Sequence, residues 1–253
     1  MVYAGYTGLY AERTYRNLVR GDDLRTFTVA VAETDLLIKA GSDLRDLALQ
    51  AVIECRADLE SYIARDPVFR TTLVPHRLLP GAPDIAVTMA RAARLAGVGP
   101  MAAVAGAIAE WVGRRLLERS DEARGEVIVE NGGDIFMASK RDRRVGIFAG
   151  DSPFTNRIAI EIPPSDMPLG ICTSAGTVGH SLSLGRADAA VALARDAALA
   201  DAAATAIGNL VRTPEDIAGA MEFARQIKGL MGALVIKGDK MAIYGRVKLV
   251  PVR

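Results

Sequence analysis

One short stretch of the chain, residues 171–185, reads ICTSAGTVGHSLSLG and concentrates chemically active side chains. It holds five hydroxyls, one of the two cysteines and one of the two histidines. Hydroxyl donors beside a flexible glycine backbone are typical of loops that bind an anion. We therefore predict ligand contacts from Thr173, Ser174, Gly176 and Thr177.

Cys172 and His180 lie in the same stretch, and each allows two interpretations. A lowered pKa would make the Cys172 thiol reactive, although a small buried thiol is the commoner case. His180 could act as a base, but a histidine more often satisfies a buried hydrogen bond. The chain has neither a G-x-S-x-G elbow nor a Walker lysine here, which disfavours a serine hydrolase and a P-loop. Cys172 and His180 stay as candidate catalytic residues.

A second stretch, VIVENGGDIF at residues 127–136, runs from an apolar strand through two glycines into another apolar strand. Gly132 and Gly133 would let the backbone approach a ligand, and Asp134 could accept from hydroxyls or lie near a cation. An ordinary Asn-Gly hairpin turn explains the same residues. Both interpretations stay open.

The third stretch, ALADAAATAIGN at residues 198–209, places Asp201 and Thr205 four residues apart among alanines. On a helix these two side chains share one face. A carboxylate and a hydroxyl on a face of small residues suit Mg²⁺, which takes one or two protein oxygens and bridges to ligand phosphates. The alternative is an Asp201 that faces solvent.

The elements that must position these residues follow from periodicity and turn signals. We expect strands within residues 27–40, bent near Glu33, and then a helix that Asp43 caps, that runs to about Arg65 and that carries Cys55 in its core face. Further helices are expected at 83–95, 101–118, 187–209 and from 214, with strands at 126–131, 134–139, 144–150 and 156–162 and a terminal hairpin at 238–239. The strands from 126 to 162 resemble a meander.

Helices and antiparallel strands thus mix without a βαβ rhythm, and no linker or fixed-period repeat divides the chain. We expect an α/β fold of the α+β kind, with largely antiparallel sheets packed against helices, in a single domain over residues 1–253.

Composition excludes several classes of partner. The chain has 31 Lys and Arg against 30 Asp and Glu, a balance that gives no field to attract nucleic acid or an anionic membrane. Its Ala-rich apolar stretches are too short or too charged to cross a bilayer. Two cysteines make no disulfide scaffold, and the N-terminus lacks the apolar run of a signal peptide. We expect a cytoplasmic protein, and a homodimer is one arrangement that its alanine-rich helices would allow.

Together the three stretches resemble the ApbE family, the Mg²⁺-dependent FAD:protein FMN transferases, in the order GGD, Thr-Ser-Gly-type loop and A-D-A-x-x-T helix. The resemblance is closer to an ApbE-related branch known as UPF0280, and it extends from ETDLLI at 33–38 through AGVGPMAAVAGAIAE at 96–110 to the third stretch. It implies an ApbE or T-fold-like architecture. It also implies Mg²⁺ on Asp201 and Thr205 and a flavin nucleotide such as FAD along the two loops. That FAD site comprises Gly132, Gly133, Asp134, Ser174 and Gly176.

The sequence departs from the ApbE pattern at three points. TSAG replaces the usual TSG, the helix before GGD reads AAVAGAIA and lacks the family's lysine, and the H-x-x-D-P motif has no counterpart. The only histidine between GGD and the metal helix is His180. The scaffold and the metal helix are retained in this resemblance, and part of the flavin site is altered.

Three hypotheses follow from the resemblance. The first is a divergent FMN transferase that binds a phosphorylated small molecule with Mg²⁺. The second is a carrier that keeps such a ligand without transferring it. The third is a thiol-dependent factor of sulfur assimilation, of the homocysteine or cysteine kind, that uses Cys172.

Overall fold

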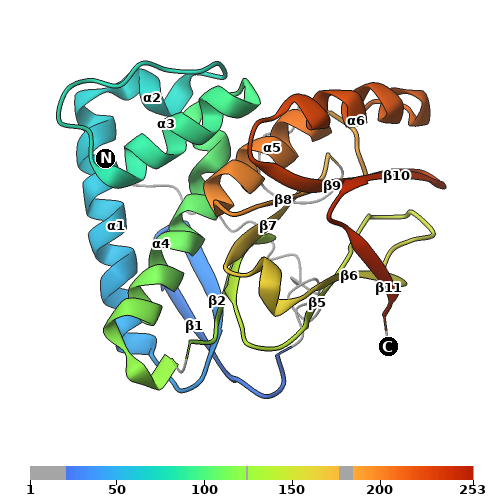
Figure 1. Ribbon diagram of the computed structural model, residues 1–253. Helices are drawn as coiled ribbons and strands as arrows, with labels where there is room; N and C mark the ends of the chain where they lie inside the picture. Colours follow the sequence, from blue (N-terminus) through green and yellow to red (C-terminus); the bar gives the residue numbers. More distant parts are fainter. Residues whose placement is uncertain (1–20, 124, 177–184, 253) are drawn as a thin grey trace, which may run out of the picture.

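The protein is built on two antiparallel sheets. The computed structural model describes residues 21–123, 125–176 and 185–252 (Figure 1). The large sheet has the order β1-β2-β3-β4-β7-β8-β9-β10 and the small one β11-β6-β5. The bounds in the large sheet are β1 Arg25–Val31, β2 Thr34–Ala40, β3 Val127–Asn131, β4 Asp134–Ala138, β7 Leu169–Ser174, β8 Ala189–Ala194, β9 Leu230–Lys237 and β10 Lys240–Gly245. Those in the small sheet are β5 Arg143–Gly146, β6 Ile158–Ile162 and β11 Lys248–Pro251.

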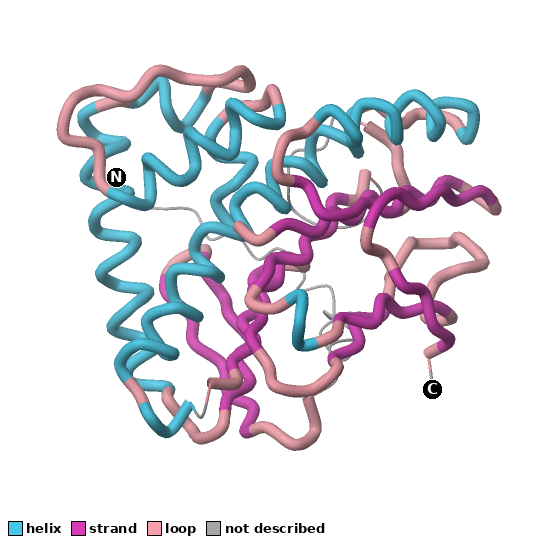
Figure 2. Tube along the Cα trace, in the orientation of Figure 1, coloured by secondary structure: helices cyan, strands magenta, loops and turns pink. Residues whose placement is uncertain are grey.

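The helices gather on one side of the large sheet, as the cyan segments of Figure 2 show. Their bounds are α1 Arg45–Arg65, α2 Pro67–Thr71, α3 Asp84–Ala96, α4 Val104–Arg119, α5 Ala197–Asn209 and α6 Ile217–Gln226, with short 3-10 turns at η2 Pro100–Ala103, η3 Asp121–Ala123, η4 Pro164–Asp166 and η5 Pro214–Asp216. Within the described residues no single helix is both long and apolar enough to cross a bilayer. Only α3 taken together with η2 and α4 reaches that length and composition, and the pair is bent by 101°.

Two hydrophobic cores lie on the two faces of the large sheet, because successive strand residues point to opposite sides. In β3, Val127 and Val129 join the helical core, while Ile128 joins the core under the small sheet. Burial on both faces explains why β3, β4 and β8 are buried at every position. The predicted fold class, a mixed α/β fold with antiparallel sheets packed against helices, is confirmed.

The predicted helix over residues 187–209 is wrong in its first half. Residues 189–194, AAVALA, form strand β8, and only Ala197–Asn209 form helix α5. Alanine favours helices intrinsically, but tertiary packing overrides this weak preference. Ala190, Ala192 and Ala194 face the helical core, and their small side chains leave room for α5 to pack on the sheet. Asp196 then begins α5 by accepting the Leu199 N–H at 3.1 Å.

Two other expected elements also differ. The four strands from 126 to 162 do not form one meander, because β3 and β4 join the large sheet while β5 and β6 pair in the small one. The first long helix begins at Arg45, and its N-cap is Leu44 without a side-chain hydrogen bond. Asp43 still accepts the Arg45 N–H at 3.1 Å, so the predicted interaction exists just before the cap. The strand pair bent near Glu33 and the hairpin at 238–239 are confirmed.

A buried arginine joins the small sheet to the rest of the molecule. Arg143 is 5% exposed, and its guanidinium donates to Asp23 at 2.5 Å and to Glu126 at 2.6 Å. Its Nε also donates to Ser139 at 2.8 Å. These bonds satisfy the charge of a cation that would otherwise be costly to bury.

Candidate functional site

The three stretches that the sequence singled out meet in one region. β3 and β4 form a hairpin whose turn is Gly132-Gly133, and β4 pairs with β7, so the turn lies beside Thr173. A Cβ on Gly133 would lie 3.8 Å from the Thr173 oxygen. Helix α5 packs against β7 and β8 and brings Asp201 to the same region. The topology of the sheet, and not closeness in sequence, assembles the site.

The turn between β3 and β4 is a tight hairpin turn, as the simpler interpretation predicted, but its two turn residues are Gly132 and Gly133, because Asn131 pairs with Asp134. Gly132 and Gly133 have φ of 66° and 104°, a left-handed conformation that L side chains rarely adopt. The Gly133 N–H donates to Glu130 Oε1 at 2.8 Å, and Asn131 Nδ2 donates to the Ala105 oxygen at 3.1 Å. The Gly133 N–H is therefore occupied by the protein itself, while none of the described residues lies within 4 Å of a Cβ placed on Gly132.

Asp201 is buried and does not face solvent. Its carboxylate accepts the Gly106 N–H at 2.9 Å, and it also accepts a hydrogen bond from the backbone of Ala105. These amides belong to the start of α4, whose positive end favours a carboxylate. Gly106 is required here, because a Cβ would lie 2.3 Å from the Ala197 oxygen. Asp201 thus ties α4 to α5 as well as facing the site.

Asp134 and Asp201 form a pair of buried acids with raised pKa values. Burial raises the pKa of Asp201 to about 7, although the backbone hydrogen bonds to its carboxylate lower it. Burial and the nearby charges of Asp201 and Glu130 raise the pKa of Asp134 well above its ordinary value. Within the described part of the chain, Asp134 Oδ1 is buried without a hydrogen-bond partner. A carboxylate pair of this kind favours a proton or a cation.

The remaining predicted contacts surround the base of the 171–185 stretch. Thr173 and Ser174 are half-buried residues at the end of β7, so they belong to a strand and not to a flexible loop. Thr205 follows Asp201 by one turn of α5 and is half-buried. Gly176 lies close to the backbone of Gly185 and leaves no room for a side chain, since a Cβ there would lie 2.3 Å from the Gly185 oxygen. Thr177 and His180 lie outside the described residues.

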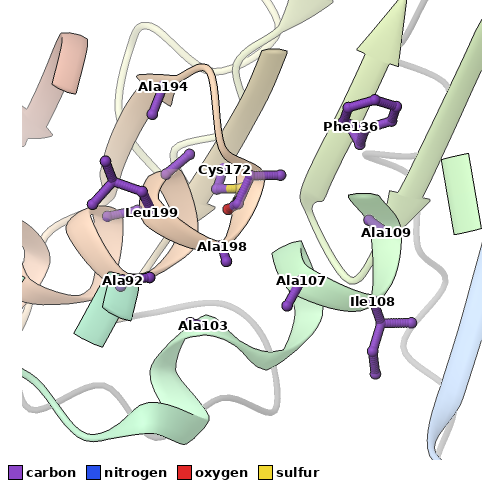
Figure 3. Packing of buried hydrophobic residues seen from close by; sticks show 14 of the residues in the cluster. Ala92, Ala103, Ala107, Ile108, Ala109, Phe136, Cys172, Ala194, Ala198 and Leu199 are labelled. Carbon is purple, nitrogen blue, oxygen red and sulfur yellow. Dashed lines mark hydrogen bonds between the residues drawn. The ribbon is translucent and has the colours of Figure 1, made fainter. Parts of the chain in front are cut away.

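Cys172 is fully buried between β7 and α5. Its thiol donates to the Ala197 oxygen at 3.5 Å, and Figure 3 shows the sulfur directed toward α5 among the alanines of the core. Burial, together with the charges of Asp134 and Asp201, raises its pKa well above the ordinary value. A thiol held in its neutral form is a poor nucleophile, so these features favour the structural interpretation.

We predict that an alkylating reagent at neutral pH labels Cys172 no faster than Cys55. Cys55 is an internal standard, because burial in the α1 core raises its pKa to about 12. Mass spectrometry of the two cysteine peptides after timed alkylation measures both rates. Rapid and selective labelling of Cys172 would instead support the sulfur-handling hypothesis.

Three groups near the site were not singled out from the sequence. Glu130 is 2% exposed beside the hairpin turn, Asn131 anchors the start of α4, and Gly106 supplies the N–H that Asp201 accepts. A charged residue inside the apolar run VIVEN was a signal that could have identified Glu130, since lone carboxylates are rarely buried. Nothing in the local sequence indicates the role of Gly106, because its partner lies on a distant helix.

The donor set is compatible with Mg²⁺. Among the described residues no group of three His, Cys, Asp or Glu side chains is arranged to hold a metal ion. Mg²⁺ does not require one, because it is commonly bound by one or two carboxylates plus water and ligand phosphates. Asp134, whose Oδ1 has no partner among the described residues, and Asp201 are two such carboxylates.

Solved structures share this architecture. The apo form of the flavinyl transferase ApbE from Pseudomonas stutzeri aligns with a TM-score of 0.55 at 12% sequence identity, over 87% of this chain and 94% of that one. A mutant of the flavin transferase ApbE from Vibrio cholerae aligns with a TM-score of 0.54 at 13% identity, over 88% and 97%. The chain therefore has the ApbE fold.

Sequence comparison identifies the family within the proteins that share this fold. The family model described as "AbpE bacteria" matches residues 16–242. The UPF0280 protein of Methanocella arvoryzae is 43% identical over 88% of this chain and 89% of its own length, and that of Methanopyrus kandleri is 46% identical over 86% and 89%. The chain belongs to the UPF0280 family and to the AbpE bacteria family, which confirms the predicted resemblance.

Proposed function

We propose that the chain binds a flavin nucleotide, or a related pyrophosphate ligand, together with Mg²⁺ at the meeting point of the Gly132-Gly133 turn and helix α5. The observation that carries the proposal is the pair of buried acids, Asp134 and Asp201, beside a turn at which no described residue crowds Gly132. Buried carboxylates with no cation partner are costly, and that cost is removed when a cation binds. The ApbE fold supports a flavin nucleotide as the ligand.

The roles of the residues follow from their positions. Asp134 and Asp201 would hold Mg²⁺, with the Thr205 hydroxyl one turn further along α5. The bound ion would neutralise the charge of the pyrophosphate and polarise its oxygens. Ser174 and Thr173 lie at the end of β7 and would donate hydroxyls to the ligand. Glu130 accepts the Gly133 N–H and so holds the shape of the hairpin turn.

We expect the protein to bind FAD but to transfer FMN poorly to the threonine-containing peptides that ApbE enzymes modify. Transfer also requires a group that positions the acceptor hydroxyl and removes its proton, and each such group contributes about 10²-fold or more. The chain lacks the H-x-x-D-P segment and the helix lysine of the ApbE pattern. Incubation with FAD, Mg²⁺ and an acceptor peptide, followed by mass spectrometry, measures the transfer.

The controls separate loss of transfer from loss of binding. Thermal stabilisation by FAD with Mg²⁺ in the same preparation would establish binding, because a ligand of the native state raises its stability by RT ln(1 + [L]/Kd). Prompt addition of an FMN mass to the peptide would contradict the prediction and make the protein an active transferase, with His180 as the candidate base.

The alternatives rank behind this proposal. A ligand carrier uses the same site without chemistry, and it differs from a divergent transferase only in showing no residual transfer of FMN. A sulfur-handling thiol is disfavoured by the burial and the raised pKa of Cys172. The single domain, the cytoplasmic location and the homodimer stay predictions.

A further inference from the structure

A pocket separate from the candidate flavin site lies between α3, α4 and the start of α5. Its volume is about 390 Å³, within the usual range of about 300–1,000 Å³ for small-molecule sites. None of its lining residues belongs to the flavin site. They are Ile85, Thr88, Arg91, Ala107, Glu110, Trp111, Arg114, Arg195 and Asp196.

The charges around the pocket leave one cation in excess. Arg91 pairs with Asp196, and Arg114 pairs with Glu110 at 2.6 Å. Arg195 instead donates to three backbone oxygens, of Asp166 at 2.8 Å, of Ser165 at 3.3 Å and of Pro168 at 3.5 Å. In the part of the chain that the structure describes, no carboxylate forms an ion pair with Arg195. The pocket therefore carries a guanidinium whose hydrogen bonds go to neutral carbonyls, so its charge is left to attract a carboxylate.

Apart from Thr88, the uncharged part of the wall is apolar, and it holds one unmatched donor. Ile85 and Ala107 are buried hydrocarbon, and the ring of Trp111 lies beside them in the lining. The Trp111 indole N–H is buried and has no acceptor among the described residues. Buried donors are normally paired. If the side chains that cover this N–H turned aside, a ligand oxygen could reach it and supply the missing acceptor.

We propose that this pocket binds a small organic carboxylate with an apolar body. The carboxylate is held by Arg195 and the body lies against Ile85, Ala107 and Trp111. One surplus positive charge favours a monoanion, and the apolar wall favours a hydrocarbon or aromatic body over a bare inorganic anion. The proposal is independent of flavin binding, since it uses no residue of that site.

The chain provides its own probe for this site. Trp111 is its single tryptophan, so a change in intrinsic fluorescence reports on the pocket. We expect benzoate to change the emission and to bind in parallel calorimetry, both without flavin or Mg²⁺, while its uncharged isostere benzamide binds at least about tenfold more weakly. Equal affinity for benzamide, or no benzoate signal by either method, would overturn the proposal. So would binding of inorganic phosphate without binding of benzoate.

Substitutions in the pocket test whether benzoate binds there. Arg195→Gln should weaken benzoate binding about tenfold or more, Arg195→Lys should weaken it less, and Thr88→Phe should abolish it by filling the pocket. Arg94→Gln removes the same charge from an exposed position of α3 outside the pocket and should leave affinity unchanged. Thermal melts establish that each variant is folded. Unchanged affinity in folded Arg195→Gln and Thr88→Phe would show that benzoate binds elsewhere and would reject the assignment.

Discussion

Without Mg²⁺ or ligand, the protein should become less stable by about 2 kcal/mol or more as the pH rises from about 5.5 to about 8. Burial raises the pKa of Asp201 from 3.8 to about 7, so the folded state holds a proton that the unfolded state has already released. This contribution to stability is complete at a pH below the pKa of Asp201 in the unfolded state. It is lost as the pH rises through the pKa of Asp201 in the folded state. Asp134 adds to the effect in the same direction. Urea unfolding at a series of pH values measures it.

Two comparisons test the cause of this pH dependence. Asp201→Asn removes the titrating group and should flatten the profile, whereas Asp58→Asn, an exposed carboxylate on α1, should leave it unchanged. Mg²⁺ should restore stability near pH 8 and do little near pH 5.5, because it binds the charged carboxylates. A wild-type profile that stays level or rises over this range would contradict the account of the buried acids.

Arg143→Met is expected to destabilise the protein by about 3–5 kcal/mol, because it leaves two carboxylates without their buried cation. Asp23 and Glu126 both pair with this guanidinium, and the hydrogen bonds from Arg143 lower the pKa of Asp23. Methionine has a similar volume, so the loss reports mainly on charge and hydrogen bonding. The free energy of unfolding in urea measures the change.

Arg141→Met is the matched control. Arg141 also pairs with Asp23, at 3.3 Å, but its side chain is 69% exposed. Exposed ion pairs contribute about 0–1 kcal/mol, so this variant should lose little. Equal losses in the two variants would mean that burial of the Arg143 network does not determine its contribution.

The sequence predicted the positions of most elements because their signals are local. Alternating apolar residues marked β1 and β2, and the Gly-Asp turn marked the last hairpin. The same reasoning failed at β8, whose alanines favour a helix when read alone. Their strand conformation depends on β7 and β9 on either side and on α5 packed above them. Such contacts join residues that lie far apart in sequence.

The candidate site was predictable in its residue types and not in its hydrogen bonds. Asp201 stood out as a lone carboxylate among alanines, and its burial beside Asp134 accords with that signal. The chain gave no local sign that Asp201 also accepts the N–H of Gly106, since the two lie 95 residues apart. Cys172 shows the opposite case: its neighbours in the sequence are polar and suggest a reactive thiol, but in the fold it packs against α5, close to the two buried acids that hold it neutral.

The most direct test of the central claim is calorimetric titration of FAD into the protein with and without Mg²⁺, near pH 8. We predict binding that depends on Mg²⁺, that weakens strongly in Asp201→Asn and less in Thr205→Ala, and that is unchanged in Asp58→Asn. Mg²⁺-independent binding, or the same Mg²⁺-dependent affinity in well-folded Asp201→Asn, would contradict the assignment of the metal and flavin site to helix α5.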